Sequence, residues 1–148
     1  MKFNFLGEVC SSIDDKDRIV IPSKFRDLFD EGSYITKGCE GCISIYPSES
    51  WNEYVSSLLA STKDSTSGRQ IRRSIASKST PYECDKSGRV KLPKNLLELS
   101  GITKQCMIVG AFDHLEIWEL KAWQEYDVAA NEIFEEELDK ISMNGGMM

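Results

Sequence analysis

The chain has 148 residues, of which 41% are hydrophobic and 28% are charged, and its formal net charge is −6. This size and balance are typical of one globular domain, or of two small ones packed closely, with a real core. No apolar run approaches the ~18 residues that span a bilayer, and Glu8 interrupts the N-terminus before a signal-peptide core could form. We therefore expect a cytoplasmic protein with no membrane partner.

The charge is unevenly distributed along the chain. Residues 1–26 carry a net charge of +1 and residues 63–94 carry +6, whereas 27–62 carry −5 and 95–148 carry −8. A charged partner responds to the local field of a patch rather than to the total charge. The acidic total is therefore compatible with a nucleic-acid partner.

A nine-residue motif occurs twice, with a spacing of 71 residues. It covers 14–22 and 85–93, and each copy reads Asp, three residues, Arg, three residues, Pro. The match then continues at a spacing of 72 through three aromatic pairs: Tyr46 and Trp118, Trp51 and Trp123, Tyr54 and Tyr126. Self-similarity of this kind indicates one supersecondary unit used twice.

Each copy predicts the same succession of elements: a polar turn, a β-branched strand, a proline-led helix, a strand hairpin and a second helix. In the first copy these are the turn 14–17, the strand 18–21, a helix from Pro22 to Gly32, the strands 34–36 and 43–46, and a helix 48–59 with a cap at Pro47-Ser48. In the second copy these are the turn 85–88, the strand 89–92, a helix that ends at Gly101, the strands 107–109 and 115–118, and a helix 123–141. Both glycines stand where a helix end favours a left-handed residue.

Two further segments carry distinct patterns. A polar linker over 61–68 leads into a short basic helix over 68–75, in which Arg69, Arg72 and Arg73 form either a solvated face or a contact surface. The last helix has an apolar stripe and an opposite acidic face that carries Glu132, Glu135, Glu136 and Asp139.

These elements predict a β-rich α+β fold. One unit alone would leave apolar faces and sheet edges uncovered, so we expect the two units to pair about a pseudo-twofold axis and close into a barrel-like body with peripheral helices. The predicted divisions are 5–60 for the first repeat with its helix, 61–80 for the linker and basic helix, and 81–148 for the second repeat with the C-terminal helix.

Cysteine and histidine give little sign of a catalytic or metal site. Five cysteines are an odd count and do not resemble a secreted disulfide framework. Cys39 and Cys42 form a Cys-x-x-Cys pair, which is either a metal or redox site or a reduced pair in a turn, and it supplies two of the four ligands that structural zinc needs. His114 is the lone histidine, and no nucleophile and base can be assembled around it. We expect no cofactor, no metal, no small-molecule substrate and no enzymatic activity.

The doubled Asp-x-x-x-Arg motif with its apolar residues and proline resembles the swapped-hairpin DNA-binding unit of the AbrB superfamily. The tandem arrangement, with segments 5–7, 38–46 and 109–118, resembles the MraZ family over roughly 5–126. The resemblance implies a bacterial transcriptional regulator that binds tandem short direct repeats in the promoter of the division and cell-wall gene cluster. It also implies a ring-like homo-oligomer, with an octamer as a candidate, that is associated with the nucleoid in the cytoplasm.

Two positions depart from the family pattern. The family usually has glycine before the first arginine, and Asp17 stands there in this chain, which places an anion beside the proposed phosphate contacts and should lower the affinity. In the second copy, Leu97 and Glu98 replace the pair Arg26 and Asp27 of the first, so the DNA-facing arginine of the superfamily is retained at Arg26 only. We therefore expect the second copy to have a supporting role.

The candidate DNA contacts are the cations in and beside the two motifs, because arginine and lysine meet phosphates and the arginine fork can also read base edges. They are Lys16, Arg18, Lys24 and Arg26 in the first copy, and Lys86, Arg89, Lys91 and the neighbouring Lys94 in the second. Asp14, Asp85, Pro22 and Pro93 are the predicted structural residues of the motifs. The pairs Asp14–Arg18 and Asp85–Arg89 could instead be ion pairs that only fix the turns, or they could hold each arginine ready for DNA.

A rival hypothesis is an AbrB-fold antitoxin or protein-interaction module, since the same fold can bind a protein. Such a module would normally combine a single copy with a tail that wraps its partner, and the segment after the last helix, 143–148, is short. A stoichiometric protein partner would favour this rival, and promoter DNA would favour the regulator.

Overall fold

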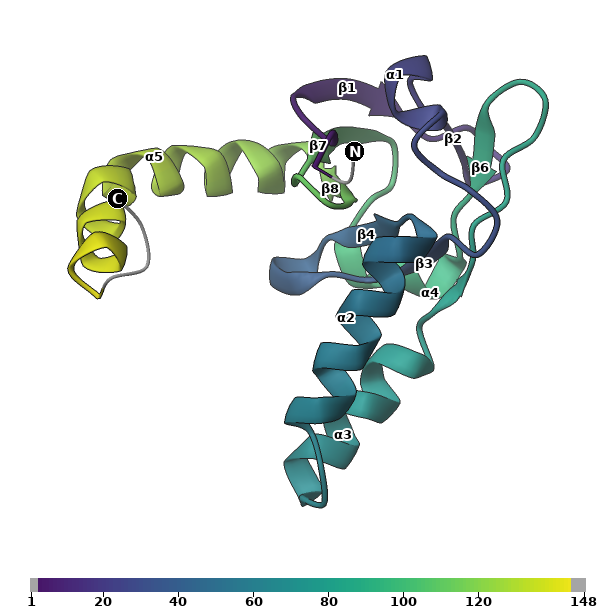
Figure 1. Ribbon diagram of the computed structural model, residues 1–148. Helices are drawn as coiled ribbons and strands as arrows, with labels where there is room; N and C mark the ends of the chain where they lie inside the picture. The colour runs from purple at the N-terminus through teal and green to yellow at the C-terminus, as the bar shows by residue number, and fades with distance from the viewer. Residues whose placement is uncertain (1–2, 145–148) are drawn as a thin grey trace.

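The computed structural model describes residues 3–144, which form a β-rich body from which helices project (Figure 1). The strands are β1 (Glu8–Ser12), β2 (Arg18–Val20), β3 (Tyr34–Lys37), β4 (Ile43–Tyr46), β5 (Thr80–Pro81), β6 (Arg89–Lys91), β7 (Gln105–Gly110) and β8 (Leu115–Glu119). The helices are α1 (Ser23–Arg26), α2 (Ser48–Ser61), α3 (Thr66–Ala76), α4 (Lys94–Ser100) and α5 (Leu120–Met143), with a 3-10 turn at Cys39–Gly41. The mixed α+β class that the sequence predicts is confirmed.

The main sheet is antiparallel and has the strand order β1-β7-β8-β4-β3-β5. Exchanging the equivalent strands of the two repeats reverses this order, so the sheet has pseudo-twofold symmetry. At its centre Ser44 lies opposite Glu116, and these residues occupy the same place in the two repeats. The hairpins β3–β4 and β7–β8 form as the sequence predicts.

Each repeat contributes its first strand to the other repeat. Strand β1 precedes the first motif but pairs with β7, and β5 precedes the second motif but pairs with β3. Strands β2 and β6 form a separate two-stranded sheet, in which Ile19 lies opposite Val90, its equivalent in the other motif. The pseudo-twofold axis therefore also passes through the pair Ile19–Val90.

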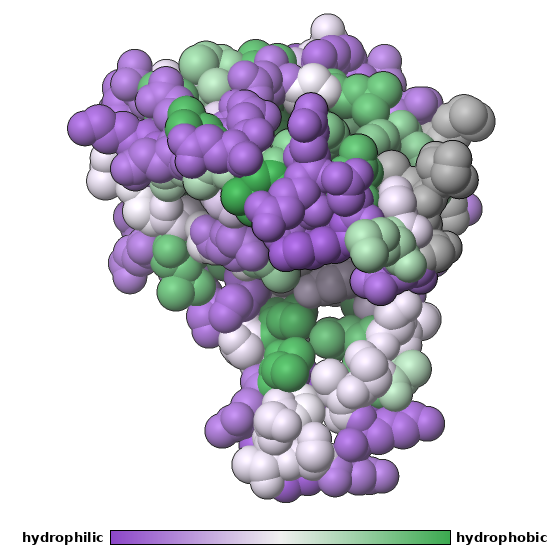
Figure 2. Space-filling view, turned by 90° about the vertical axis from the view of Figure 1, so that its left-hand side faces the viewer, coloured by the Kyte–Doolittle hydropathy of each residue, from purple (hydrophilic) through white to green (hydrophobic). Residues whose placement is uncertain are grey.

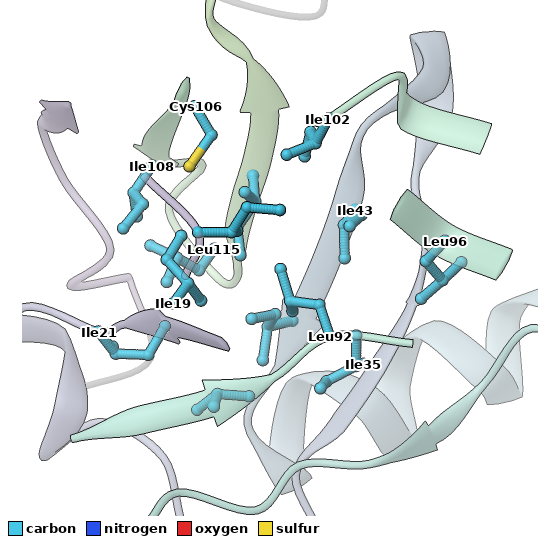
Figure 3. Packing of buried hydrophobic residues seen from close by; sticks show 14 of the residues in the cluster. Ile19, Ile21, Ile35, Ile43, Leu92, Leu96, Ile102, Cys106, Ile108 and Leu115 are labelled. Carbon is cyan, nitrogen blue, oxygen red and sulfur yellow. The ribbon is translucent and has the colours of Figure 1, made fainter. Parts of the chain in front are cut away.

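The core lies between the small sheet and the main sheet (Figure 3). The two motifs contribute equivalent side chains to it, and all of them are fully buried: Ile19, Ile21 and Phe25 from the first motif, and Val90, Leu92 and Leu96 from the second. Branched strand residues alternate with outward-facing ones, so each short strand places one apolar side chain in the core per two residues. Burial of these side chains stabilises the association of the two repeats.

The prediction of a barrel-like body that closes both sheets is wrong. The main sheet is open, with β1 and β5 at its two edges. Strands β2 and β6 pair with each other and leave those edges without the partners that closure requires. The edge strand β5 has only two residues, and its proline lacks a backbone donor, which limits pairing with further strands.

The two proline-led helices differ in length. Helix α4 ends at Ser100 and is capped by Gly101, whose φ of 71° is left-handed as the sequence predicts. Helix α1 ends already at Arg26, so the predicted end at Gly32 is wrong. After α1 the chain continues in tight turns that bring Phe29 against Tyr82 and Phe5, with ring centroids 4.5 and 5.2 Å apart. These aromatic contacts replace further helical turns.

Helices α2 and α3 pack against each other and project from the body as an arm of residues 48–76 (Figure 1). The predicted cap at Pro47-Ser48 is only partly right, because Asp30 satisfies the start of α2. Its carboxylate accepts the Ser48 backbone N–H at 3.0 Å and the Ser48 hydroxyl at 2.6 Å. Hydrogen bonds from Ser48 lower the pKa of Asp30.

Helix α5 packs on β7 and β8 and then extends away from the body (Figure 1). Trp123 and Tyr126 on its first turns contact Trp118 of β8, with centroids 5.2 and 4.8 Å apart. Within residues 3–144 no helix has both the length and the apolar character needed to cross a bilayer.

Candidate nucleic-acid interface

The first motif turn is held by one carboxylate. Asp14 Oδ1 accepts the backbone N–H groups of Lys16 and Arg18, each at 2.9 Å, and Oδ2 accepts Arg18 Nε at 2.8 Å. The hydrogen bond from the Arg18 backbone is the main cause of a lowered Asp14 pKa. The carboxylate thus remains ionised and fixes both the turn and the arginine side chain.

The second turn repeats this geometry. Asp85 Oδ1 accepts the N–H groups of Ser87 and Arg89 at 2.9 Å, and Oδ2 accepts Arg89 Nε at 2.9 Å. The pKa of Asp85 is lowered, again mainly by the arginine backbone. The sequence leaves open whether these ion pairs only fix the turns or also hold each arginine ready for DNA. The two roles are compatible, because the ion pairs fix the turns and engage only Nε of each arginine. In the described part of the chain the outer Nη groups of Arg18 and Arg89 have no partner.

The two motifs meet in one surface, which we call the cationic ribbon: strands β2 and β6 with the turns 14–17 and 85–88. Arg18 lies opposite Lys91 and Val20 lies opposite Arg89. Ile19 and Val90 are fully buried, and side chains alternate along a strand, so these four residues share the outer face. The structure thus brings arginines that are 71 residues apart onto one side of a single two-stranded sheet.

Lysines extend the ribbon at both ends. Lys16 and Lys86 lie at the tips of the two turns and are exposed, as is Lys91 on β6. Across residues 3–144, no hydrogen bond or ion pair engages these three ammonium groups. Because β2 and β6 are antiparallel, the two turns lie at opposite ends of the ribbon. The result is a row of cations with exposed Val20 near its middle.

Arg26 is placed differently from the ribbon arginines. It is half-buried, and its Nε and Nη2 donate to the carbonyl oxygen of Ile21 at 3.1 and 2.8 Å. Its guanidinium lies against Gly88 of the other repeat, where a Cβ would stand 2.4 Å from Arg26 Cζ. In this arrangement Arg26 joins the two repeats, and Nη1 is its unengaged nitrogen within the described residues.

Lys24, on α1, is exposed, and its ammonium lies 4.9 Å from the centroid of the Phe25 ring. It is close to the backbone of Gly7, where a Cβ would be 3.1 Å from Nζ. Pro22 and Pro93 occupy equivalent cap positions with φ of −55° and −61°, directly before α1 and α4. Both prolines therefore set the direction in which each motif leaves the ribbon.

Asp17 and Lys94 form an ion pair that the sequence did not reveal. Asp17 has a left-handed φ of 62°, as Gly88 has at the equivalent position, with 81°. The Asp17 carboxylate lies 3.3 Å from Lys94 Nζ, and the lysine side chain is 83% exposed. Asp17 therefore adds an anion to the end of the ribbon, and Lys94 partly compensates it. The pairing could be inferred only once β2 and β6 were known to be neighbours.

The aromatic residues pack away from the ribbon. Tyr46 stacks on Tyr54 with centroids 4.9 Å apart, and Trp51 stacks on Tyr34 at 4.9 Å. With the equivalent cluster of the second repeat around Trp118, they join the helices to the main sheet. This agrees with the prediction that they belong to the core or to an interface rather than to a base-stacking platform.

The cysteines and the histidine form no metal site in the described part of the chain. Cys39 is exposed and Cys42 is buried, and burial raises the pKa of the Cys42 thiol to about 12. His114 lies between two carboxylates, with Nδ1 2.8 Å from Asp113 and Nε2 3.1 Å from Glu116. Hydrogen bonds and charge from Glu116 and Asp113 outweigh the effect of burial and raise the pKa of His114, so the two carboxylates favour its protonated form.

Comparison with known proteins agrees with the doubled architecture. The sequence model of the family described as MraZ protein, antitoxin-like, matches twice, at residues 4–73 and 75–142. A protein of Lactobacillus gasseri named "Transcriptional regulator MraZ" is 37% identical over 142 residues, covering 94% of this chain and 99% of the relative. Proteins with the same name from Lachnoclostridium phytofermentans (38% over 122 residues, 81% and 84%) and Clostridium tetani (36% over 144 residues, 95% and 99%) are also similar.

These matches extend over both repeats, including the strands that each repeat contributes to the other. The relatives carry the name of a transcriptional regulator and not that of an enzyme. The chain belongs to the MraZ family.

Proposed function

We propose that the protein is a sequence-specific DNA-binding transcriptional regulator and that the cationic ribbon is its DNA-binding surface. The observation that carries the proposal is the antiparallel pairing of β2 with β6, which gathers Arg18, Arg89 and Lys91 on one outer face. The names of the relatives support regulation as the role. The proposed target is the set of tandem direct repeats in the promoter of the division and cell-wall gene cluster, and the proposed location is the nucleoid.

The ribbon suits duplex DNA in shape and charge. The major groove admits a two-stranded β-ribbon, and base edges there present hydrogen-bonding groups to arginine. Asp14 and Asp85 hold Arg18 and Arg89 by Nε and leave the outer edge of each guanidinium for a partner. Pre-orientation of this kind lowers the entropy lost on binding. The turn lysines Lys16 and Lys86 are placed to meet phosphates on either side.

The geometry also redefines the proposed roles of the other candidates. Arg26 stabilises the structure beneath the outer face of the ribbon, because two of its nitrogens donate hydrogen bonds to the carbonyl oxygen of Ile21. Arg18 and Arg89 then contribute equally to DNA binding. This proposal replaces the expectation that the first copy reads the bases and the second copy has a supporting role. Lys24 contributes a phosphate contact from α1.

A single ribbon would bind few base pairs. A homo-oligomer, ring-like in our proposal, presents several identical ribbons to tandem repeats, so each later contact forms at a high effective concentration. Assembly is therefore part of recognition.

The test is a binding series on the upstream DNA of the cell's own division genes, with a shuffled probe for comparison. Arg18→Ala and Arg89→Ala should each weaken binding by ~1–3 kcal/mol per site. The control is Lys140→Ala, which removes an exposed cation of α5 that pairs with Glu137, and it should bind like the wild type. Unchanged binding in both arginine variants, with folding intact by circular dichroism, would refute the ribbon as the DNA-binding surface.

The second candidate function is an antitoxin or protein-interaction module, favoured by the antitoxin-like description of the family. The segment on which the tail argument rests continues beyond Asn144, outside the described residues. Affinity purification from the native cell separates the two functions, because an antitoxin returns a stoichiometric protein partner and the regulator returns promoter DNA.

A further inference from the structure

One of the four residues on the outer face of the cationic ribbon is apolar. Val20 is 49% exposed and lies directly opposite Arg89. Within residues 3–144, the other large apolar side chains with comparable exposure lie on helices or outside the named strands. Figure 2 shows hydrophobic groups of this kind gathered on the arm. Val20 stands instead on a strand and among cations, where bound DNA would meet it.

The register of β2 and β6 brings the side chains of Val20 and Arg89 close together. The Ile21 backbone N–H donates to the Gly88 carbonyl at 2.8 Å, immediately beyond this pair. The pair is therefore of the non-hydrogen-bonded type, in which opposite side chains approach most closely. The Cβ atoms of such pairs are about 4.5–5.5 Å apart, and successive base pairs are about 3.4 Å apart. Val20 and Arg89 can thus reach the same base pair or two neighbouring ones.

A valine on a DNA-binding face can recognise one feature of the base edges. In the major groove these edges present hydrogen-bond donors and acceptors, and one apolar group, the 5-methyl of thymine. A donor or acceptor covered by an isopropyl group would lose its water without gaining a partner, which costs free energy. Contact with the thymine methyl removes two apolar surfaces from water and is favourable. The chemistry of the side chain therefore selects thymine.

We propose that Val20 is a specificity-determining residue that packs on the 5-methyl group of a thymine in the DNA site. Arg89, beside it, supplies hydrogen bonds to the same base pair or to its neighbour. This inference rests on the proposed function, in which the cationic ribbon binds duplex DNA, and it names a base that the ribbon distinguishes.

The contact also gives the DNA site a direction. The equivalent of Val20 in the second motif is Lys91, which lies opposite Arg18. One half of the ribbon thus presents two cations, and the half with Val20 presents one cation and one apolar group. The two halves are two residues apart along the strands, about 6.6 Å, which corresponds to about two base-pair steps. A ribbon with identical halves would fit a twofold-symmetric site, whereas this one fits a site with two different halves.

The experiment measures binding of the full chain by fluorescence anisotropy to a duplex from the upstream DNA of the cell's own division genes. In a second set of probes, deoxyuridine replaces each thymine of one repeat in turn. This change removes the methyl group and preserves base pairing. At one position it should weaken binding by about fourfold, as expected for the loss of one buried methyl group.

Val20→Ala tests which side chain reads the methyl group. The variant lacks the two methyl groups that reach farthest from β2, so its affinities for the thymine probe and the deoxyuridine probe should become equal. The matched control is Val128→Ala, which makes the same change at a residue of α5 that is 60% exposed. This control should retain the wild-type difference between the two probes.

Two results would overturn the proposal. One is a probe series in which deoxyuridine weakens binding at no position, because the ribbon then reads no thymine methyl group. The other is a Val20→Ala variant that distinguishes the probes as strongly as the wild type does, because another residue then makes the contact.

The outcome is separable from that of the DNA-binding proposal. If Arg18→Ala and Arg89→Ala weaken binding but Val20→Ala retains the difference between the probes, the thymine inference fails and the cationic ribbon stands. If both arginine variants bind like the wild type, the ribbon is the wrong surface and the thymine inference fails with it.

Discussion

One of the positions at which the two motifs differ decides much of the local structure. It is Asp17 in the first motif and Gly88 in the second, and both have a positive φ. Each carbonyl accepts a backbone N–H from the other motif at 2.8 Å, from Leu92 and from Ile21. The glycine leaves room for the guanidinium of Arg26, whereas the equivalent of Arg26 in the second motif is the buried Leu97, which lines the same surface hollow as Asp17. The asymmetry of the ribbon therefore follows from two positions at which the repeats differ.

Gly88→Ala should destabilise the protein more than Gly101→Ala. Both glycines have left-handed φ, 81° and 71°, so both changes carry a backbone cost of about 1 kcal/mol. A Cβ at Gly101 meets nothing within 4 Å, but at Gly88 it would displace Arg26 from the Ile21 carbonyl. The lost hydrogen bonds add about 1–3 kcal/mol, measurable by urea unfolding.

The control for this prediction is the double variant Gly88→Ala with Arg26→Ala. With the guanidinium removed, the added Cβ has nothing to displace, so the additional cost of Gly88→Ala should vanish in the Arg26→Ala background. Equal costs for Gly88→Ala and Gly101→Ala would contradict the placement of Arg26.

At the scale of single residues, the sequence predicted which side chains in the motifs are chemically important, but not where all of them lie. The links from Asp14 to Arg18 and from Asp85 to Arg89 are local, with the partners four positions apart, so the spacing was enough to suggest them as ion pairs. The orientation of Arg26 depends on Gly88, which is distant in sequence and comes near only through the β2–β6 pairing. Propensity and periodicity carry no information on such a contact.

Among the elements, the hairpin β7–β8 is fixed to the first repeat by His114. The imidazole stacks on Tyr46 with centroids 4.6 Å apart and an interplanar angle of 17°. Glu116 also accepts the indole N–H of Trp118 at 3.0 Å. A protonated histidine can donate to both Asp113 and Glu116, and a neutral one can donate to only one of them. Protonation of this one ring therefore determines whether both carboxylates have a hydrogen-bond donor.

The stabilisation by His114 should decrease as the pH rises. Burial lowers its pKa, but hydrogen bonds and charge from Glu116 and Asp113 outweigh burial, so the folded-state pKa is raised above 6.5. The contribution is therefore fully present below pH 6.5 and is lost as the pH rises through the higher folded-state value. The difference in unfolding free energy between wild type and His114→Gln, about 1.5–3 kcal/mol near pH 6, should shrink toward pH 9. A difference that stays constant over this range would argue against an imidazolium.

The sequence predicted elements best where the pattern is local. The hairpins, α2, α3, α4 and α5 follow from alternation, helical spacing and turn residues within a few positions. It missed β1 and β5, because Glu8–Ser12 is mostly polar and Thr80–Pro81 is two residues long. Both become strands through long-range pairing, and the same pairing leaves the sheet open. The prediction of a barrel was therefore wrong because local patterns identify the strands but not which strands pair with each other.

At the scale of the whole molecule, charge is separated in space. The total is −6, yet the ribbon gathers cations and α5 carries most of the acid of the C-terminal third. Exposed charges more than about 10 Å apart are largely screened at physiological salt. An acidic protein can therefore bind DNA through a local cationic surface, with the acidic surface reducing non-specific contacts.

The logarithm of the DNA-binding constant should fall linearly with the logarithm of the salt concentration, despite the negative total charge of the protein. Lys91→Ala removes an exposed cation of the ribbon and should reduce the slope by about 0.9. Lys121→Ala removes an exposed cation at the start of α5 and should leave the slope unchanged. Titrations by fluorescence anisotropy at several salt concentrations provide the measurement, and equal slopes for the two variants would place the contact surface elsewhere.

The exchange of first strands between the repeats has a consequence for synthesis on the ribosome. Strand β1 emerges early but must wait for β7, about a hundred residues later, before its backbone groups find their partners. Until then the first repeat exposes unpaired strand edges, a state that is prone to aggregation. Folding of this chain should therefore be largely post-translational, with the nascent first half a natural client for chaperones.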